Sequence, residues 1–347
     1  MNTSVIQTAG RTAWVIPVLC AVVLAAAGGC LLTGSVDIPA SDVWAALTGG
    51  EPSNHIRSVI VLETRVPMVV YAAVAGAALA VAGLLLQTCF NNPLAGPSIL
   101  GISTGASLGV GIVVLAFGGM MAEGWGEYLN VMVGAIVGSG VVLLALMALS
   151  TIVKSTAMLL IAGILVGYFA SSAIALLNYY STHESVYSYA IWGLGSFSGG
   201  SAARASAFAL TGLPLIVISM LFVKPLNAML LGERYASSLG VDMRRTRHLL
   251  LVVAGLLTAI VTAFCGPIGF LGLIVPHIAR MLLRTSNHAS LLPATALCGA
   301  AIALICAWIS VRFGGDGVLP INAITPVIGV PVVLYVMINR KKLHYFE

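Results

Sequence analysis

Three short patterns in this sequence contain residues that could carry out chemistry. The first is GISTG at 101–105, which fits the G-x-S-x-G pattern of a serine nucleophile, with Ser103 as the nucleophile and His277 as its base. Such a nucleophile needs a sharp turn between a strand and a helix, whereas GISTG opens an apolar run with glycines at helical packing spacing. We therefore interpret Ser103 as a packing residue and do not expect an intramembrane hydrolase.

The second pattern is Lys154 followed by Ser155, which resembles the end of a nucleotide-binding P-loop. Val153 and Ala148 occupy positions where that loop requires glycine. We expect no nucleotide site in this chain, so any energy from ATP must be supplied by another chain.

The third pattern is His277, which directly follows Pro276 and precedes Arg280 by three positions. We interpret it as a histidine near a helix start whose ring is hydrogen-bonded by the backbone or by a neighbouring loop, and a direct ligand contact is the alternative. The six cysteines have no CxxC spacing and no nearby histidines, which predicts structural thiols, no disulfide, no metal site and no cofactor. They are Cys20, Cys30, Cys89, Cys265, Cys298 and Cys306.

The segment 179–197 is unusually aromatic. An interfacial belt explains this composition, and the alternative is a set of rings around the mouth of a cavity for a large planar or catecholate ligand. The aromatic residues are Tyr179, Tyr180, Tyr187, Tyr189, Trp192 and Phe197.

The composition requires elements that lie in a membrane. Of 347 residues, 59% are hydrophobic and only 8% are charged, and the mean hydropathy is +1.05. Soluble domains carry roughly 25% charged residues. The net charge of +5 does not indicate nucleic-acid binding, because the basic residues lie in short loops beside apolar runs. The chain is therefore predicted to be an all-α polytopic membrane protein.

Apolar runs between polar or Gly/Pro breaks predict about ten transmembrane helices. The first is interpreted as an uncleaved span rather than a signal peptide. The eighth is too short to cross alone, so we expect a partial helix packed among its neighbours. The predicted spans are 13–33, 66–88, 99–119, 131–153, 157–179, 206–223, 248–265, 270–283, 291–311 and 321–339.

The distribution of basic residues predicts that both termini are cytoplasmic. With that orientation, twelve of the 16 Lys and Arg residues lie inside, and only Arg57, Arg65, Arg204 and Arg312 lie outside. No acidic residue falls inside a predicted span, which argues against an ion-coupled secondary transporter. Glycines recur at four-residue spacing within spans, which predicts close helix packing. They are Gly101, Gly105, Gly109, Gly134, Gly138, Gly163 and Gly167.

The stretch 224–247 is the one long interior segment rich in charge, KPLNAMLLGERYASSLGVDMRRTR. We predict a pair of short cytoplasmic helices there through which another protein acts on the chain. Its basic tail, Arg244, Arg245 and Arg247, is interpreted as an anchor to lipid headgroups.

Several long motifs in the chain resemble the FecCD family, the permease subunits of ABC importers for iron-siderophores, haem and vitamin B12. The motifs are ETRVPMVVYAAVAGAALAVAGLLLQTCFNNPLAGPSILGISTGASLG, MLLIAG, LNAMLLGERYASSLGV and GPIGFLGLIVPHIARMLL. The resemblance covers nearly the whole chain from about residue 30, and it implies ten spans with both termini inside.

The resemblance implies roles for nine residues. The coupling-helix motif, which sits in a groove of the ATPase subunit, matches Gly232, Glu233, Ala236, Leu239 and Gly240, and Gly240 is expected to end the helix with a left-handed cap. Two outer arginines that dock a binding protein match Arg65 and Arg312, with ion pairing to Glu63 or Asp316 as the alternative. The cytoplasmic gate matches Ser155 and Thr156, which are also candidates for a helix N-cap.

The chain departs from the family pattern at the outer side and in the final span. Met68 stands where a second arginine is common, Trp308 where an aspartate is common, and Val318 where a glutamate is common. The stretch at 320–326 reads PINAITP rather than PxGxxTA. These changes bear on docking and substrate choice.

We therefore predict one transmembrane permease domain over 1–347, with the type II ABC importer permease fold and no enzymatic activity of its own. The resemblance implies import of iron chelates, either siderophore or haem, with vitamin B12 as the alternative. It also implies a homodimer with two ABC ATPase subunits and a substrate-binding protein, in the inner membrane of a bacterial cell, with no nucleic-acid partner.

Overall fold

The computed structural model describes residues 2–50, 54–117, 125–153, 155–315 and 317–338, and within these ranges the secondary structure is entirely helical. The elements in chain order are α1 (Asn2–Leu32), α2 (Ala40–Thr48), α3 (His55–Ile60), the π-helical turn η1 (Val61–Arg65), α4 (Val66–Cys89), α5 (Ile102–Gly111), the π-helical turn η2 (Ile112–Ala116), α6 (Trp125–Ile152), α7 (Thr156–Tyr180), α8 (His183–Gly193), α9 (Ala202–Ser219), the 3₁₀ turn η3 (Met220–Phe222), α10 (Val223–Met229), α11 (Glu233–Ser238), α12 (Met243–Cys265), α13 (Leu271–Leu283), α14 (His288–Arg312) and α15 (Ile321–Ile338).

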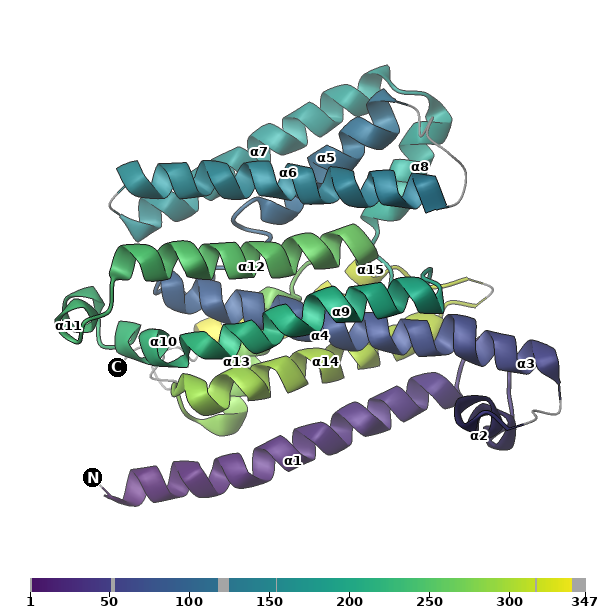
Figure 1. Ribbon diagram of the computed structural model, residues 1–347, viewed down its shortest axis with the longest axis horizontal. Helices are drawn as coiled ribbons and strands as arrows, with labels where there is room; N and C mark the ends of the chain where they lie inside the picture. The colour runs from purple at the N-terminus through teal and green to yellow at the C-terminus, as the bar shows by residue number, and fades with distance from the viewer. Residues whose placement is uncertain (1, 51–53, 118–124, 154, 316, 339–347) are drawn as a thin grey trace.

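Helix α4 forms the centre of the bundle, with α9, α12, α13 and α14 packed around it (Figure 1). Every residue from 74 to 89 is buried. Two glycine pairs allow the close approach: a Cβ on Gly76 would collide with the Gly299 carbonyl of α14, and one on Gly83 with the Gly272 carbonyl of α13. Backbone contact of this kind replaces a hydrophobic driving force, which is absent between helices in lipid.

A second group, α5 to α8, lies beside this core, and α12 contacts both groups (Figure 1). The glycine spacing seen in the sequence holds α5 against its neighbours. A Cβ on Gly109 would collide with Gly134 of α6, and one on Gly101 would come within 2.9 Å of the Gly163 carbonyl of α7. The predicted close packing of these helices is confirmed.

Seven helical segments of the described residues are long and apolar enough to cross a membrane, and three shorter apolar helices accompany them. The shorter ones are Ile102–Ala116, Leu271–Leu283 and Ile321–Tyr335. Each predicted span corresponds to one of these ten segments. The expected partial helix is α13, which has 13 residues and packs against α4, α14 and α15.

Three elements had no counterpart in the sequence-based prediction: α2, the α3–η1 extension of α4, and α8. They lie outside the predicted spans. The short elements α3 and η1 extend α4 at its N-terminal end, so that one continuous apolar helix runs over His55–Cys89.

The two ends of the bundle differ in what they carry (Figure 1). The start of α1 lies at the same end as the α10–α11 pair, called the α11 end below, and α2 and α3 lie at the other, the α2 end. The predicted pair of short helices in 224–247 is confirmed as α10 and α11. Lys154, Asp316 and the basic C-terminal residues 340–342 lie outside the described residues.

Candidate functional site

Helix α11 is a six-residue helix with a glycine at each end. Gly232 precedes it with φ 95° and Gly240 follows it with φ 85°, both in the region that disfavours residues with a Cβ. The Val241 N–H donates to the Ala236 carbonyl and the Gly240 N–H to the Ser237 carbonyl, each at 3.0 Å. This is a Schellman cap, so the predicted left-handed termination at Gly240 is confirmed.

The surface of α11 is almost entirely exposed. Tyr235 is 70% exposed and Leu239, one turn further on, is 65% exposed, and Leu231 is also exposed just before the helix. The exception is Ala236, which is fully buried on the side where α11 contacts α10 and α12. Of the motif residues expected in an ATPase groove, Ala236 therefore packs inward in this structure. Tyr235, which no motif position singled out, lies on the outer face instead.

Glu233, the first residue of α11, is held by Arg247 of α12, whose Nη2 lies 2.5 Å from Glu233 Oε1. The Arg247 side chain is only 13% exposed, whereas that of Glu233 is 58% exposed. The interpretation of Arg247 as a lipid anchor is therefore wrong, because its largely buried guanidinium is paired with Glu233. Arg245, in contrast, pairs with Asp242 at the exposed start of α12.

Ser155 is the N-cap of α7, where its hydroxyl accepts a hydrogen bond from the Met158 N–H at 3.4 Å. The predicted capping role of Ser155 is confirmed. Thr156 is the first residue of α7, and its side chain lies outside what the structure describes.

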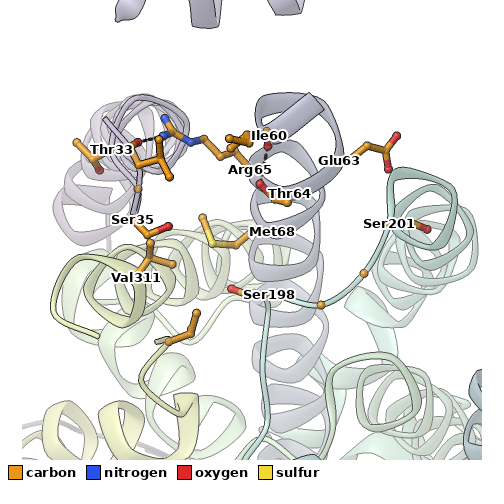
Figure 2. Close-up of a pocket in the computed structure, with 15 residues that line it drawn as sticks. Thr33, Ser35, Ile60, Glu63, Thr64, Arg65, Met68, Ser198, Ser201 and Val311 are labelled. Carbon is orange, nitrogen blue, oxygen red and sulfur yellow. Dashed lines mark hydrogen bonds between the residues drawn. The ribbon is translucent and has the colours of Figure 1, made fainter. Parts of the chain in front are cut away.

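Arg65, at the end of η1, is 4% exposed, and its guanidinium points toward the segment that follows α1 (Figure 2). Nη1 donates to the Leu31 carbonyl at 2.6 Å, and Nη2 donates to the Val36 carbonyl. A Cβ on Gly34 would come within 3.0 Å of Nη2, so this segment wraps closely around the guanidinium. Arg65 therefore joins α4 to the end of α1 in this structure.

Glu63 points away from Arg65 (Figure 2) and accepts a hydrogen bond from the Ala202 N–H at the start of α9 at 3.2 Å. A carboxylate there is favoured by the helix dipole. The structure thus gives Glu63 a partner other than Arg65. Arg312, the other predicted docking residue, is the last residue of α14 and is exposed.

Three of the departures from the family pattern meet at one place in the fold. Met68 and Val318 line a cavity of about 670 Å³ at the α2 end, which Arg65 and Glu63 also line (Figure 2). Trp308 donates its indole N–H to the hydroxyl of Thr33, another lining residue, at 2.7 Å. No signal in the sequence places these positions together, since they come from three different helices and loops.

A second cavity, of about 490 Å³, lies among α5, α7, α8 and α15. Its polar groups are neutral: Ser103, Thr104 and Ser107 of α5, Tyr189 of α8 and Asn322 of α15. The Tyr189 hydroxyl donates to the Ser107 carbonyl at 3.1 Å, and burial raises the pKa of Tyr189 to about 12. The cavity can therefore offer hydrogen bonds and an aromatic ring to a ligand, without ionised groups among these residues.

The aromatic segment divides between the two expected roles. Tyr179, Tyr180 and Tyr187 are exposed, as a belt requires, whereas Tyr189 lines the cavity and packs on Trp192 with ring centroids 5.9 Å apart.

His277 lies in the middle of α13 rather than at its start, because Pro276 is accommodated inside the helix. Its Nε2 is 2.9 Å from the Pro93 carbonyl, so the expected bond to a neighbouring loop is confirmed. The GISTG sequence leads into helix α5 from Gly101, with a left-handed φ of 76°, and no strand precedes it in the described residues. The hydrolase geometry is absent from this part of the chain, and in the same ranges no three His, Cys, Asp or Glu residues form a metal site.

A bundle of apolar, span-length helices, a cavity with a neutral lining and a short exposed helix at one end fit a membrane protein of the permease class. The chain belongs to the FecCD transport family, which matches residues 18–339. The resemblance found in the sequence is thereby confirmed.

Relatives with assigned names are similar over most of their length. The hemin transport system permease protein HmuU of Yersinia pestis is 30% identical over 321 residues, covering 90% of this chain and 93% of its own. The vitamin B12 import system permease protein BtuC of Salmonella paratyphi A is 33% identical over 313 residues, with the same two coverages, 90% and 93%.

A solved structure, an inward-facing conformation of a metal-chelate type ABC transporter, superposes with a TM-score of 0.81 at 29% identity. The match covers 94% of this chain and 98% of that one. The permease fold expected from the sequence therefore extends over nearly the whole chain.

Proposed function

We propose that the chain is the membrane-spanning permease subunit of an ATP-driven importer for iron chelates, with ATP hydrolysed on a separate ABC ATPase. The observation that carries the proposal is α11, whose exposed Tyr235 and Leu239 form an apolar surface on a helix attached outside the bundle core. Aromatic and aliphatic side chains exposed in this way are typical anchors of a protein interface. Gly232 and Gly240 allow the backbone turns at the two ends of α11, and Glu233 ties the helix to α12 through Arg247.

In this proposal the α11 end is cytoplasmic and the α2 end faces the binding protein. The chain crosses the membrane ten times as one permease domain over 1–347, with the three shorter helices packed among the longer ones. The charge distribution supports this orientation, because Lys224, Arg234 and Arg244 lie at the α11 end and Arg57 at the α2 end. The proposed location is the bacterial inner membrane.

The working assembly proposed is a homodimer with two ATPase subunits and a substrate-binding protein. Closure of the ATPases would move the α10–α11 pair of each subunit, and rocking of the two subunits would open the path alternately to either side. Ser155 and Thr156 at the start of α7 are the proposed cytoplasmic gate. Arg312 is the proposed docking group for the binding protein. The buried Arg65 stabilises the same end of the bundle by its hydrogen bonds to the Leu31 and Val36 carbonyls.

The cavity lined by Ser107, Tyr189 and Asn322 is the proposed contact surface for the substrate inside the permease. A neutral, hydroxyl-bearing and aromatic lining suits a bulky chelate that must pass without being held tightly. Vitamin B12 is the second candidate, favoured by the 33% identity to a permease named for its import.

The ATPase interface is tested by replacing Tyr235 and Leu239 together with alanine. The affinity of the purified permease for its ABC ATPase is expected to fall at least about tenfold, because truncating two interface anchors removes a large part of a binding hot spot. The matched control is Tyr187→Ala with Leu194→Ala, which deletes the same two side-chain types from exposed positions on α8 and at its C-cap. Equal affinity of the unmodified chain and the Tyr235, Leu239 variant would show that α11 is not the docking helix.

The substrate class is tested in proteoliposomes containing the permease, the ATPase and the binding protein. ATP-driven uptake is compared for haem, ferrichrome and cyanocobalamin, and uptake of an iron chelate in preference to cyanocobalamin is expected. Uptake by the permease alone, driven by an ion gradient without ATP, would favour a secondary transporter and contradict the proposed function.

A further inference from the structure

The last turn of α4, Gln87 to Cys89, is where helix α10 of the α10–α11 pair is attached to the buried core. We propose that Asn227, His288 and Thr88 are positioning residues for transport, which carry displacement of this pair into α4 and on to the loop 90–94 beside the proposed gate. The inference rests on the proposed function and names the internal connection that it requires.

The attachment of α10 is a chain of directed hydrogen bonds. Asn227 of α10 accepts two of them through Oδ1, from the His288 backbone N–H at 2.8 Å and from His288 Nδ1 at 2.9 Å. Because a carbonyl oxygen can only accept, Nδ1 carries the ring proton, which leaves Nε2 as an acceptor. The Thr88 hydroxyl lies 2.9 Å from Nε2 and therefore donates to it. Each group in the chain has one compatible role.

Burial makes this series of hydrogen bonds costly to break. His288 is fully buried, and Thr88 is nearly so. In such a site a separated donor and acceptor cannot exchange their bond for one to water, so separation is penalised more than it would be at the surface. Displacement of α10 therefore takes the start of α14 and the end of α4 with it, or breaks the part-buried Asn227–His288 hydrogen bonds or the buried His288–Thr88 hydrogen bond.

Helix α11 is joined to the bundle by a separate contact. Glu233 of α11 is paired with Arg247 of α12, and α12 packs directly against α4. Helices α10 and α11 thus reach α4 by two routes, α10 through His288 and Thr88 and α11 through α12.

From this turn the connection continues into the loop 90–94. The Asn91 N–H donates to the Thr88 carbonyl at 3.2 Å and the Asn92 N–H to the Gln87 carbonyl at 3.0 Å. The loop shares a cavity of about 400 Å³ with Ala157 and Leu160 of α7, directly after the proposed gate residues. The loop therefore has space to move against the start of α7 when the end of α4 is displaced.

The experiment measures the accessibility of the gate as the rate at which a cysteine introduced by Met158→Cys is modified. Met158 is 61% exposed and lies in the first turn of α7. The background is Cys20→Ala, since Cys20 is the exposed one of six free cysteines. In the permease–ATPase complex, the rate with a water-soluble maleimide is compared without nucleotide and with ATP and vanadate. This readout needs no substrate.

The decisive variants remove or retain the hydroxyl group of Thr88. Thr88→Val is expected to reduce the nucleotide-dependent change in labelling rate at least about fivefold while the ATPase still co-purifies. Thr88→Ser retains the donor and should keep the change. The matched control is Thr295→Val, which removes a buried hydroxyl from α14 that has no hydrogen-bond partner among the described residues.

A full labelling response in Thr88→Val, or an equal loss in Thr295→Val, would overturn the proposal. If Thr88→Val fails to fold, variants of the half-buried Asn227 provide the test. Asn227→Ala should lose the nucleotide-dependent change in labelling rate, and Asn227→Asp, which keeps the acceptor oxygen, should retain it. A response in Asn227→Ala equal to that of the Cys20→Ala, Met158→Cys background would overturn the proposal as well. Failure of the unmodified chain to bind any ABC ATPase would instead refute the proposed function, which separates the two failures.

Discussion

Arg65 at the α2 end and Arg247 at the α11 end are both largely buried, but their guanidinium groups have different partners. Arg65 donates to backbone carbonyls of Leu31 and Val36, which belong to the end of α1 and the segment after it. Arg247 pairs with the carboxylate of Glu233, on a short helix that otherwise exposes nearly every side chain.

The difference shows how each end is built. At the α2 end a buried charge is used to join parts of the same bundle, so its loss should damage folding before it damages binding. At the α11 end the arginine holds an exposed helix by one carboxylate, so the helix keeps its outer surface available and remains tied to α12. A basic residue at a span end therefore has no fixed role. Its burial and its acceptors decide the role.

The largest expected effect is at the α2 end. Arg65→Met leaves two carbonyls without their donor and should lower the free energy of unfolding by about 2–4 kcal/mol. Thermal unfolding in detergent measures the effect, and Arg312→Met, at an exposed position, is the control, with a change within about 0.5 kcal/mol. Equal shifts in the two variants would remove the contrast between a buried and an exposed arginine.

An intermediate effect is expected at the cap of α11. Gly240→Ala places a Cβ at φ 85° and should cost about 1–2 kcal/mol of local stability, which frays α11 and weakens ATPase binding several-fold. Gly315→Ala carries the same kind of strain at the α2 end, with φ 62° and open space around the added Cβ. ATPase co-purification should fall in the first variant and not in the second. The same loss in both would mean that the cap of α11 has no special part in docking.

The smallest expected effect concerns the association of the binding protein. Arg312→Glu should slow association about two- to tenfold at low salt, and less at 0.15 M salt, because an exposed charge acts mainly by steering. Surface plasmon resonance at two salt concentrations measures this, with Arg312→Gln giving a smaller change. A rate independent of the residue at 312 would leave the α2 end without an electrostatic docking group. Arg65 is unsuited to the same test because of its burial.

Sequence reasoning was most successful where one physical constraint acts alone. Apolar runs predict where helices form, so each of the ten predicted segments overlaps a helix of the described residues, and seven of these helices are long enough to cross a membrane. The cap at Gly240 follows from the lack of a Cβ at a helix end. The glycine contacts of α5 with α6 and α7 follow from four-residue spacing.

Contacts between distant parts of the chain could not be predicted in this way. Thr88 and His288 are 200 positions apart, and no periodicity links them. The basic tail predicts a lipid anchor for Arg247 as for Arg244 and Arg245, whereas the turn of the helix directs the Arg247 side chain inward. Helices α2 and α8 were missed because they lie outside the long apolar runs.

The burial of α4 has a consequence for biosynthesis. Its contact surfaces for α13 and α14 include Gly76 and Gly83, but the last residue of α14 is translated about 220 residues after the end of α4. At roughly 5–20 residues per second this delay amounts to about 10–45 s. Helices α13 and α14 can pack on α4 only after they have been translated. The helix at the centre of the finished bundle is thus made well before two of its main neighbours.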